Sequence, residues 1–296
     1  MLLTGTMPVL MALPAAAQSA AEPKPAFKGQ IHATRLGQFE LVSILAGGGR
    51  NSDPQGTFGV DVPPEAFRQV SEQNFIPSDW TGGSFTPILL RGPDGLALFD
   101  TGMEPANVVA GLAMAGVKPE DIRHVMLTHM HGDHIGGLMQ DGAPVFANAE
   151  LVAPRAEAEY WAKNPGDAYT AKVAPLIDKA RLIGDGDEVL PGVRAEAAPG
   201  HTPGHTTYLL ESDGQKLLLT GDSFNHHVWS VQHPEWHVRF DIDKDQAAET
   251  RRRVLVRLAN ERIPFIGYHM PFPAVGFIAP NSAGAWRYVP ASYQFT

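Results

Sequence analysis

Residues 128–134 read Thr-His-Met-His-Gly-Asp-His and directly follow an apolar run at residues 122–127. Three imidazoles and a carboxylate in so short a segment are nitrogen and oxygen donors that suit Zn²⁺ or a similar first-row divalent ion. Because the apolar run predicts a strand, we expect a metal-binding loop at a strand end, with a solvated polar loop as the alternative. One short loop cannot supply every ligand of two ions, so further ligands are expected downstream.

Three polar residues further along the chain each close a strand-like segment. His201 lies in Ala-Pro-Gly-His-Thr-Pro-Gly-His at residues 198–205, and Asp222 and His269 each follow an apolar run. Side chains at strand ends gather at one edge of a sheet, where open metal sites are usually built. We therefore expect all three to be ligands. For His269, a hydrogen-bonded position in the core is the alternative.

At these residues the chain resembles the hydrolases of the metallo-β-lactamase fold. The likeness is carried by His129-x-His131-x-Asp133-His134, then His201, Asp222 and His269, and by Phe99-Asp100-Thr101-Gly102. It runs from about residue 36 to the C-terminus. It is closest to the methyl parathion hydrolase branch, which includes lactone-hydrolysing relatives, and residues 200–208 and 288–293 carry that closer match. The resemblance implies an α/β fold, the αββα sandwich, in which two mixed sheets pack face to face with helices outside.

The resemblance also divides the ligands between two ions. One ion would take His129, His131 and His201, the other Asp133, His134 and His269, and Asp222 would bridge them. Two such ions can hold a shared hydroxide, because the pKa of a bound water falls from about 15.7 to about 7. We therefore expect Asp133 and Asp222 to be catalytic and no serine or cysteine to be a nucleophile. Zinc is the expected metal, with Mn, Co or Fe as alternatives.

Further residues are expected around the metals. Asp100 is expected to orient a ligand imidazole, with an ordinary turn residue as the alternative. His205 is expected to support its loop or line the pocket, because Pro203 and two glycines argue against a helix that would place it beside His201. The aromatic and amide candidates for an apolar pocket are Phe75, Trp80, Phe224, Asn225, Trp229, Trp236 and Phe272, with core packing as the alternative for each aromatic. A pocket-edge loop, or plain exposure, is expected for His226, His227, His233 and His237.

The resemblance favours hydrolysis of a lactone or carboxylic ester, with N-acyl homoserine lactones among the candidate substrates. Organophosphate phosphotriesterase activity is the alternative. Small lactonases of the superfamily carry a tyrosine three positions after the bridging aspartate, where this chain has Asn225, and residues 223–241 depart from methyl parathion hydrolase. A β-lactamase is less favoured because the chain has no cysteine near the second metal. A catalytically idle metal-binding protein is a further alternative.

Composition limits the partners. The 296-residue chain has a net charge of −9 and no basic run, which argues against a nucleic-acid groove. The densest basic spot, residues 251–253, falls in a predicted helix at 245–261, where we expect a solvated face. We expect one catalytic domain at residues 26–296, a small-molecule ester or lactone as partner and no stable membrane association, and a homodimer stays open.

The N-terminal residues 1–25 resemble a secretory signal. Residues 8–17 are apolar and small residues follow, but no lysine or arginine precedes Lys24. We expect a bacterial periplasmic or secreted protein. A disordered tail, and with it a cytoplasmic protein, is the alternative.

Apolar patterning predicts the remaining elements. Strands are expected at residues 36–45, 84–90, 96–99, 122–127, 193–197, 206–210 and 215–219. Helices are expected at residues 63–73, 105–115, 154–161 and 168–178. Hairpin turns are expected at residues 92–95 and 212–214, and a flexible turn rather than a phosphate loop at Gly47-Gly48-Gly49.

Overall fold

The computed structural model describes residues 29–281 and 285–291. The signal-like residues 1–25 and the end of the C-terminal pattern, residues 292–293, lie outside the described residues. Within the described part, no helix is both long and apolar enough to cross a membrane.

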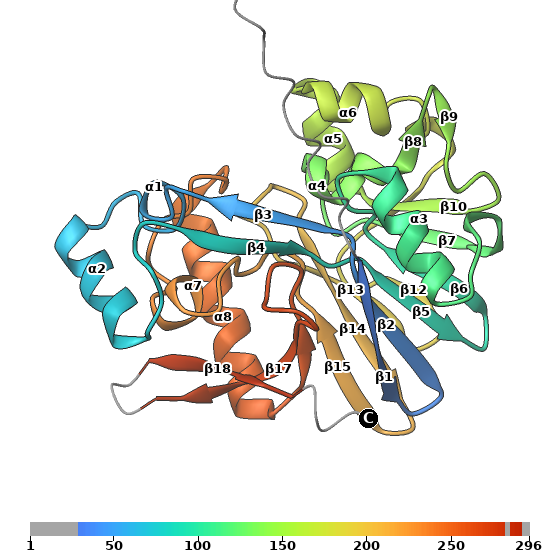
Figure 1. Ribbon diagram of the computed structural model, residues 1–296. Coiled ribbons are helices and arrows are strands. Elements are labelled where there is room, and N and C mark those ends of the chain that lie inside the picture. Colours follow the sequence, from blue (N-terminus) through green and yellow to red (C-terminus); the bar gives the residue numbers. More distant parts are fainter. Residues whose placement is uncertain (1–28, 282–284, 292–296) are drawn as a thin grey trace, which may run out of the picture.

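Two seven-stranded sheets form the centre of the molecule (Figure 1). The first has the order β1 (Gln30–Leu36), β2 (Phe39–Leu45), β5 (Ile88–Gly92), β6 (Gly95–Phe99), β7 (His124–Met126), β10 (Glu150–Pro154) and β11 (Arg181–Ile183). The second has the order β12 (Glu188–Leu190), β13 (Val193–Ala197), β14 (Thr206–Ser212), β15 (Gln215–Leu219), β16 (Phe265–Ile266), β17 (Val275–Pro280) and β18 (Trp286–Pro290). Both sheets are mixed: β6, β7, β10 and β11 pair in parallel, as do β15 and β16, and the other neighbours are antiparallel.

Helices cover the outer faces, so the expected αββα architecture is confirmed. α3 (Pro105–Met114) packs on β1 and β2, α5 (Arg155–Lys163) on β10 and β11, and α8 (Lys244–Glu261) on β17. Side-chain alternation along a strand explains why both faces are apolar. In β5, Leu90 belongs to the core between the sheets, whereas Leu89 belongs to the core that includes α3.

Shorter elements complete the fold. The ribbon of β3 (Gly47–Asn51) and β4 (Thr81–Phe85) extends from the sheets toward α1 (Gln55–Phe58) and α2 (Pro64–Gln73), as Figure 1 shows. The other short segments are α4 (Gly132–Ile135), α6 (Asp167–Lys172), α7 (Trp229–Gln232), the 3₁₀ turns η1 (Pro119–Asp121), η2 (Gly136–Leu138) and η3 (Ile177–Lys179), and the hairpin of β8 (Met139–Gln140) and β9 (Ala143–Pro144).

Four element predictions were wrong in detail. The strand expected at 36–45 is the β1–β2 hairpin, because Gly37 turns the chain at a φ of 56°. The strand expected at 84–90 is interrupted before β5, next to Pro87, which lacks a backbone N–H donor. The helix expected at 168–178 ends at Lys172 and resumes only as η3. The three glycines at 47–49 form β3 rather than a turn, since pairing with β4 supplies their hydrogen bonds.

Candidate metal centre

Strand ends from both sheets converge on one cluster of polar side chains. His129 and His131 follow β7, and His134 lies in α4 directly after them. Asp222 follows β15 and His269 follows β16, while His201 lies in the loop between β13 and β14. All seven predicted ligands are thereby brought together. Three groups could each hold an ion with ligand atoms within 4.8 Å of one another: His129, His131 and His201; His129, His134 and Asp222; and Asp133, His134 and His269.

Asp222 lies between the first of these groups (His129, His131 and His201) and the third (Asp133, His134 and His269). Its Oδ2 is 3.2 Å from His201 Nε2 and 3.0 Å from His269 Nε2. Its Oδ1 is 3.3 Å from His134 Nε2. In the first group, His131 Nδ1 lies 3.1 Å from His129 Nε2 and 3.0 Å from His201 Nε2. One carboxylate therefore reaches ligands of both groups, which is the position of a bridge.

The donor atoms fit divalent cations. Among the described residues, His134 Nε2 and Asp222 Oδ1 are buried without a hydrogen-bond partner, a costly arrangement in a protein interior. A cation that binds both atoms removes this cost. The donors are all imidazole nitrogens and carboxylate oxygens, the ligand types that Zn²⁺ and similar ions accept.

The protonation preferences of the cluster also suit cation binding. Burial, together with the neighbouring His201, lowers the pKa of His131 to about 3, so its ring is neutral. Burial opposes the charge of Asp222, but His269 and His134 hold the pKa of its carboxyl well below the usual range. Burial likewise opposes the charge of His201, but hydrogen bonds to Asp222 and Asp241 raise its pKa to about 9. His131 and Asp222 therefore already have the forms that bind a metal ion, whereas His201 would release a proton on binding.

Sequence comparison identifies the family. Residues 81–264, which include six of the seven ligands, match the metallo-beta-lactamase superfamily. The chain belongs to the metallo-beta-lactamase superfamily. An N-acyl homoserine lactonase of Bacillus sp is 36% identical over 169 residues, which are 56% of this chain and 63% of that protein. A second, from Bacillus cereus, is 36% identical over 117 residues, which are 39% of this chain and 44% of that protein. The matches thus span about half of these relatives' length.

Solved structures of the superfamily share the fold. The dizinc quorum-quenching lactonase AidC, in complex with a product, superposes with a TM-score of 0.80 at 23% identity, covering 88% of this chain and 97% of that one. The hydrolase AbOPH of the beta lactamase superfamily gives the same values. At this identity the likeness shows the shared architecture.

Three imidazoles of the candidate metal centre are held in place through Nδ1, the ring nitrogen that faces away from the cluster. His134 Nδ1 donates to Asp100 Oδ2 at 2.8 Å, His201 Nδ1 to Asp241 Oδ1 at 2.7 Å, and His269 Nδ1 to the Ser84 carbonyl at 2.9 Å. Such contacts set the tautomer and leave Nε2 free to bind. Asp100 therefore lies where the sequence placed it, against a ligand imidazole.

Two buried side chains that the sequence analysis did not predict at the site support the loops that carry the candidate ligands. Arg251 is only 1% exposed and donates to Asp241 Oδ2 at 2.8 Å, so the predicted solvated face was wrong at this position. Glu157 is fully buried and joins two loops: Oε1 accepts from Met130 N at 2.9 Å, and Oε2 accepts from Thr202 Oγ1 at 2.7 Å and Gly204 N at 3.0 Å.

His205 uses both ring nitrogens for loop contacts. Its Nδ1 donates to the Ala198 carbonyl at 3.0 Å, and its Nε2 accepts from the Asp222 backbone N at 2.9 Å. The ring therefore holds Asp222 in place. Both ring nitrogens of His205 are therefore occupied, and His201 remains the predicted ligand of this loop.

A cavity of about 610 Å³ opens onto the metal centre. Its wall includes the ligands His131, Asp133, His201, Asp222 and His269, the polar residues Arg50, Asn51, Thr57, Thr81, Asn225, His226 and Arg239, and the apolar side chains Phe58, Phe85, Met103 and Phe240. The same cavity is thus lined by candidate ligands and by apolar, mostly aromatic, side chains.

Most of the aromatic residues predicted for the pocket lie elsewhere. Phe224 packs on Phe265 in the core between the sheets. Trp229 and Trp236 pack on Phe67 in a separate aromatic cluster. Phe75 is 97% exposed, and neither it nor Phe272 lines the cavity. Trp80 contributes indirectly, because the guanidinium of Arg50 lies 4.5 Å over its ring.

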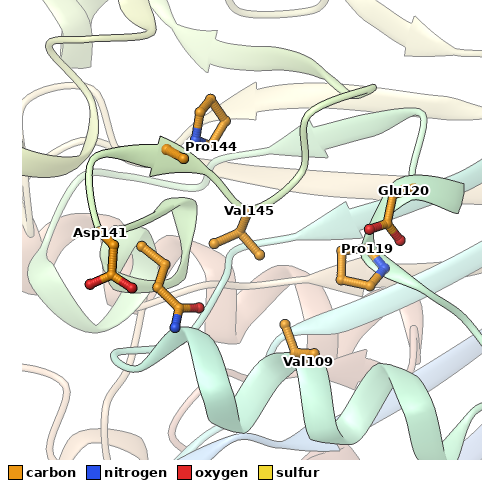
Figure 2. A pocket seen from close by; sticks show the side chains of 8 residues that line it. Val109, Pro119, Glu120, Asp141, Pro144 and Val145 are labelled. Carbon is orange, nitrogen blue, oxygen red and sulfur yellow. The ribbon is translucent and has the colours of Figure 1, made fainter.

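A second hollow lacks the same chemistry. It measures about 470 Å³ and lies between α3 and the β8–β9 hairpin, lined by Val109, Pro119, Glu120, Asp141 and Val145 among others (Figure 2). Its lining contains two carboxylates but no histidine. The metal centre is therefore the better candidate for catalysis.

Proposed function

We propose that the chain is a metal-dependent hydrolase of lactones or carboxylic esters, with N-acyl homoserine lactones as its substrate class. The observation that carries the proposal is the meeting of two ligand groups at Asp222, on the wall of a cavity large enough for a small ester. The names of the related Bacillus lactonases support the choice of a lactone.

The ligand set would hold two divalent ions, and zinc is the proposed metal. His129, His131 and His201 would bind one ion, and Asp133, His134 and His269 the other, with Asp222 shared. Such ions lower the pKa of a bound water toward about 7 and polarise the oxygen of an ester carbonyl.

The protein's own residues would position the reacting groups. Asp222 is held from two sides, by the Nδ2 of Asn225 at 2.9 Å and by His205 at its backbone N. Asp133 and His131 face the same cavity. Phe58 and Phe85 give the cavity an apolar side, which would bind an acyl chain and exclude water from the ester. The arrangement suits an uncharged ester with a hydrocarbon part.

The test is hydrolysis by one zinc-reconstituted preparation of four substrates: N-hexanoyl homoserine lactone, an aryl ester, a β-lactam and a methyl phosphotriester. We expect the lactone or the aryl ester to have the highest kcat/KM. Asp222→Ala should lower kcat by orders of magnitude with an unchanged circular dichroism spectrum, because the shared ligand is lost.

His233→Ala is the matched control, since His233 does not line the cavity; it pairs with the exposed Glu235 at 3.1 Å and stacks on Trp236. It should keep wild-type activity. A phosphotriester preferred more than tenfold over the lactone would replace the proposal with its alternative. Two bound metals with no turnover of any substrate would indicate an idle member of the superfamily.

We also propose that the chain is exported to the bacterial periplasm or beyond. The support is the apolar segment at residues 8–17, followed by small residues. Expression of the full chain and of residues 26–296 in a Gram-negative host, followed by fractionation, tests this. We expect the full chain to be exported and residues 26–296 to stay in the cytoplasm. Retention of both proteins in the cytoplasm would contradict the proposal.

A further inference from the structure

His226 lies on the wall of the metal-centre cavity but belongs to none of the three ligand groups. Its ring is buried and stacks on Trp229, with ring centroids 3.9 Å apart, and Phe58 packs against it at 5.3 Å. A ring held between aromatic neighbours keeps one orientation. The direction in which its nitrogens point is therefore a fixed property of the site.

Backbone contacts decide which nitrogen of His226 carries the proton. Nδ1 accepts hydrogen bonds from the backbone N–H groups of Val228 and Trp229, each at 3.2 Å. A ring nitrogen that accepts has no hydrogen, so in the neutral ring the proton is on Nε2. Burial lowers the pKa of His226 well below its usual value, which keeps the ring neutral near pH 7. Nε2 is consequently an uncharged N–H donor.

This donor has only a weak partner within the described residues. Nε2 lies 3.4 Å from Thr81 Oγ1, longer than the usual 2.9 to 3.0 Å of an N–H···O bond. Thr81 also lines the cavity, and its hydroxyl donates to the Gly82 carbonyl at 3.2 Å. The neighbouring Asn225 already donates its Nδ2 to Asp222, and no tyrosine among the described residues lines the cavity. His226 thus presents on this wall an uncharged ring N–H that makes no hydrogen bond of normal length with the described residues, whereas one Nδ2 hydrogen of Asn225 is already committed to Asp222.

We propose that His226 is a substrate-binding residue whose Nε2–H donates a hydrogen bond to a neutral carbonyl oxygen of the substrate, in an ester, lactone or amide. The inference rests on the proposed hydrolase function. A neutral donor suits a carbonyl oxygen, whereas a charged phosphate or carboxylate is bound more strongly by a cation. His226 would therefore help select uncharged acyl substrates.

Two substitutions of His226 test the roles of its two ring nitrogens independently. In His226→Asn the side-chain oxygen can still accept from the backbone N–H groups, but the distal donor is lost. In His226→Gln the amide N–H can reach the position of Nε2, but the acceptor for the backbone is lost. We expect His226→Asn to keep two metals and the wild-type Tm while kcat/KM falls about tenfold, the value of one hydrogen bond. His226→Gln should have a lower Tm and a higher kcat/KM than His226→Asn. His233→Asn, which replaces a histidine that does not line the cavity, is the control and should match the wild type.

¹⁵N NMR of histidine-labelled, metal-loaded protein tests the donor without turnover. We expect a protonated Nε2 and an unprotonated Nδ1 for His226, and a shift of the Nε2–H resonance when the γ-lactam analogue of the lactone is added. A proton on Nδ1, an unshifted resonance or wild-type kcat/KM in His226→Asn would overturn the inference. If the wild type hydrolyses no ester but the lactam shifts Nε2–H, the proposed function fails and the binding role stands.

Discussion

Asp241 binds two buried side chains through separate oxygens. Oδ1 accepts from His201 Nδ1 at 2.7 Å, and Oδ2 accepts from Arg251 at 2.8 Å. Arg251 also donates to the carbonyls of Pro234 and Trp236, each at 3.0 Å. Because none of these groups reaches solvent, the orientation of a metal ligand depends on a fully paired arginine-carboxylate contact.

We predict that Asp241→Asn weakens both the metal site and the fold. Loss of the carboxylate leaves the Arg251 charge buried without a counter-ion, which costs about 3 to 5 kcal/mol. It also removes the acceptor that orients His201, and loss of such a contact lowers metal affinity about 10- to 100-fold. Chemical unfolding measures the first effect and zinc titration against a chelating dye the second.

Asp245→Asn is the control, because Asp245 is exposed and pairs only with His237, at 3.2 Å. Such a surface pair contributes at most about 1 kcal/mol. If both variants bind zinc like the wild type, Asp241 has no part in orienting His201.

At the residue scale, the sequence predicted seven ligand candidates that the structure brings together, but it did not predict the residues that support them. Four of the seven candidates are recognisable because they lie within residues 129–134, and the other three because each follows a strand-like segment. The supporting contacts join residues 40 and 45 positions apart, His201 with Asp241 and Thr202 with Glu157, so no local pattern marks them. Arg251 did carry a signal: it lies three residues after Ala248 and four before Leu255, on the buried face of its helix.

At the scale of elements, α5 joins the two loops that supply the first ligand group. Glu157, on the buried face of this helix, accepts from Met130 N between His129 and His131, and from Thr202 Oγ1 and Gly204 N after His201. Trp161, one turn later, donates to Glu157 Oε1 at 2.6 Å. A Cβ on Gly204 would lie 2.1 Å from Glu157 N, so the loop and the helix are packed as closely as glycine allows.

We predict that Glu157→Gln disturbs the first ligand group more than the second. The amide N–H₂ would face donors that need an acceptor, and each buried donor left unpaired costs about 1 to 3 kcal/mol. Stepwise titration with Co²⁺, followed by its visible spectrum, should show one weakened site and one nearly normal site.

Glu159→Gln, an exposed position on the same helix, should show two normal sites. Equal weakening of both sites in Glu157→Gln would mean that α5 supports the whole centre rather than one ligand group.

Strands with regular apolar patterning were predicted well, but the positions where a strand is interrupted were not. β13 and β15 match the predicted residues, and both hairpin turns join antiparallel strands. The breaks lie at Gly37 and Pro87, residue types that interrupt regular structure, but the apolar residues on either side of each were interpreted as one strand. β3 was missed because glycines have low strand propensity, and only the partner strand β4 stabilises them there.

At the scale of the whole molecule, the candidate metal centre lies where the two sheets meet. Ligands follow β7 in one sheet and β15 and β16 in the other, so bound ions would link both halves. A ligand that binds only the folded state stabilises it by about 2.7 kcal/mol at 100 times its dissociation constant.

We predict that a chelator lowers the Tm and that zinc restores it. For a domain of this size, each 1 kcal/mol corresponds to about 2 to 4 °C. Differential scanning fluorimetry with EDTA and then excess zinc measures the change. Asp222→Ala should respond much less to zinc, and a wild-type Tm indifferent to EDTA would contradict a metal that links the sheets.

Segments far apart in the chain line the cavity, which is why the sequence analysis predicted the wrong aromatic residues for its wall. Its apolar wall combines Phe58, Phe85, Met103 and Phe240, four segments that no local pattern connects. The predicted pocket residues Phe224, Trp229 and Trp236 are equally aromatic, but burial in the core and in the aromatic cluster takes them away from the ligands. Whether an aromatic residue can contact a substrate therefore depends on its distance from the candidate metal centre and not on its residue type.

We predict that kcat/KM rises with the length of the acyl chain of N-acyl homoserine lactones, from butanoyl to octanoyl, until the cavity is filled. Each buried methylene contributes up to about 0.8 kcal/mol, or about fourfold in kcat/KM. Phe240→Ala should flatten this dependence, because Phe240 lines the cavity and is already 51% exposed, so its loss disturbs the core little. Phe75→Ala, at a 97% exposed position away from the cavity, should leave the slope unchanged. A kcat/KM that is independent of chain length, or the same slope in both variants, would mean that the acyl chain does not bind along this wall.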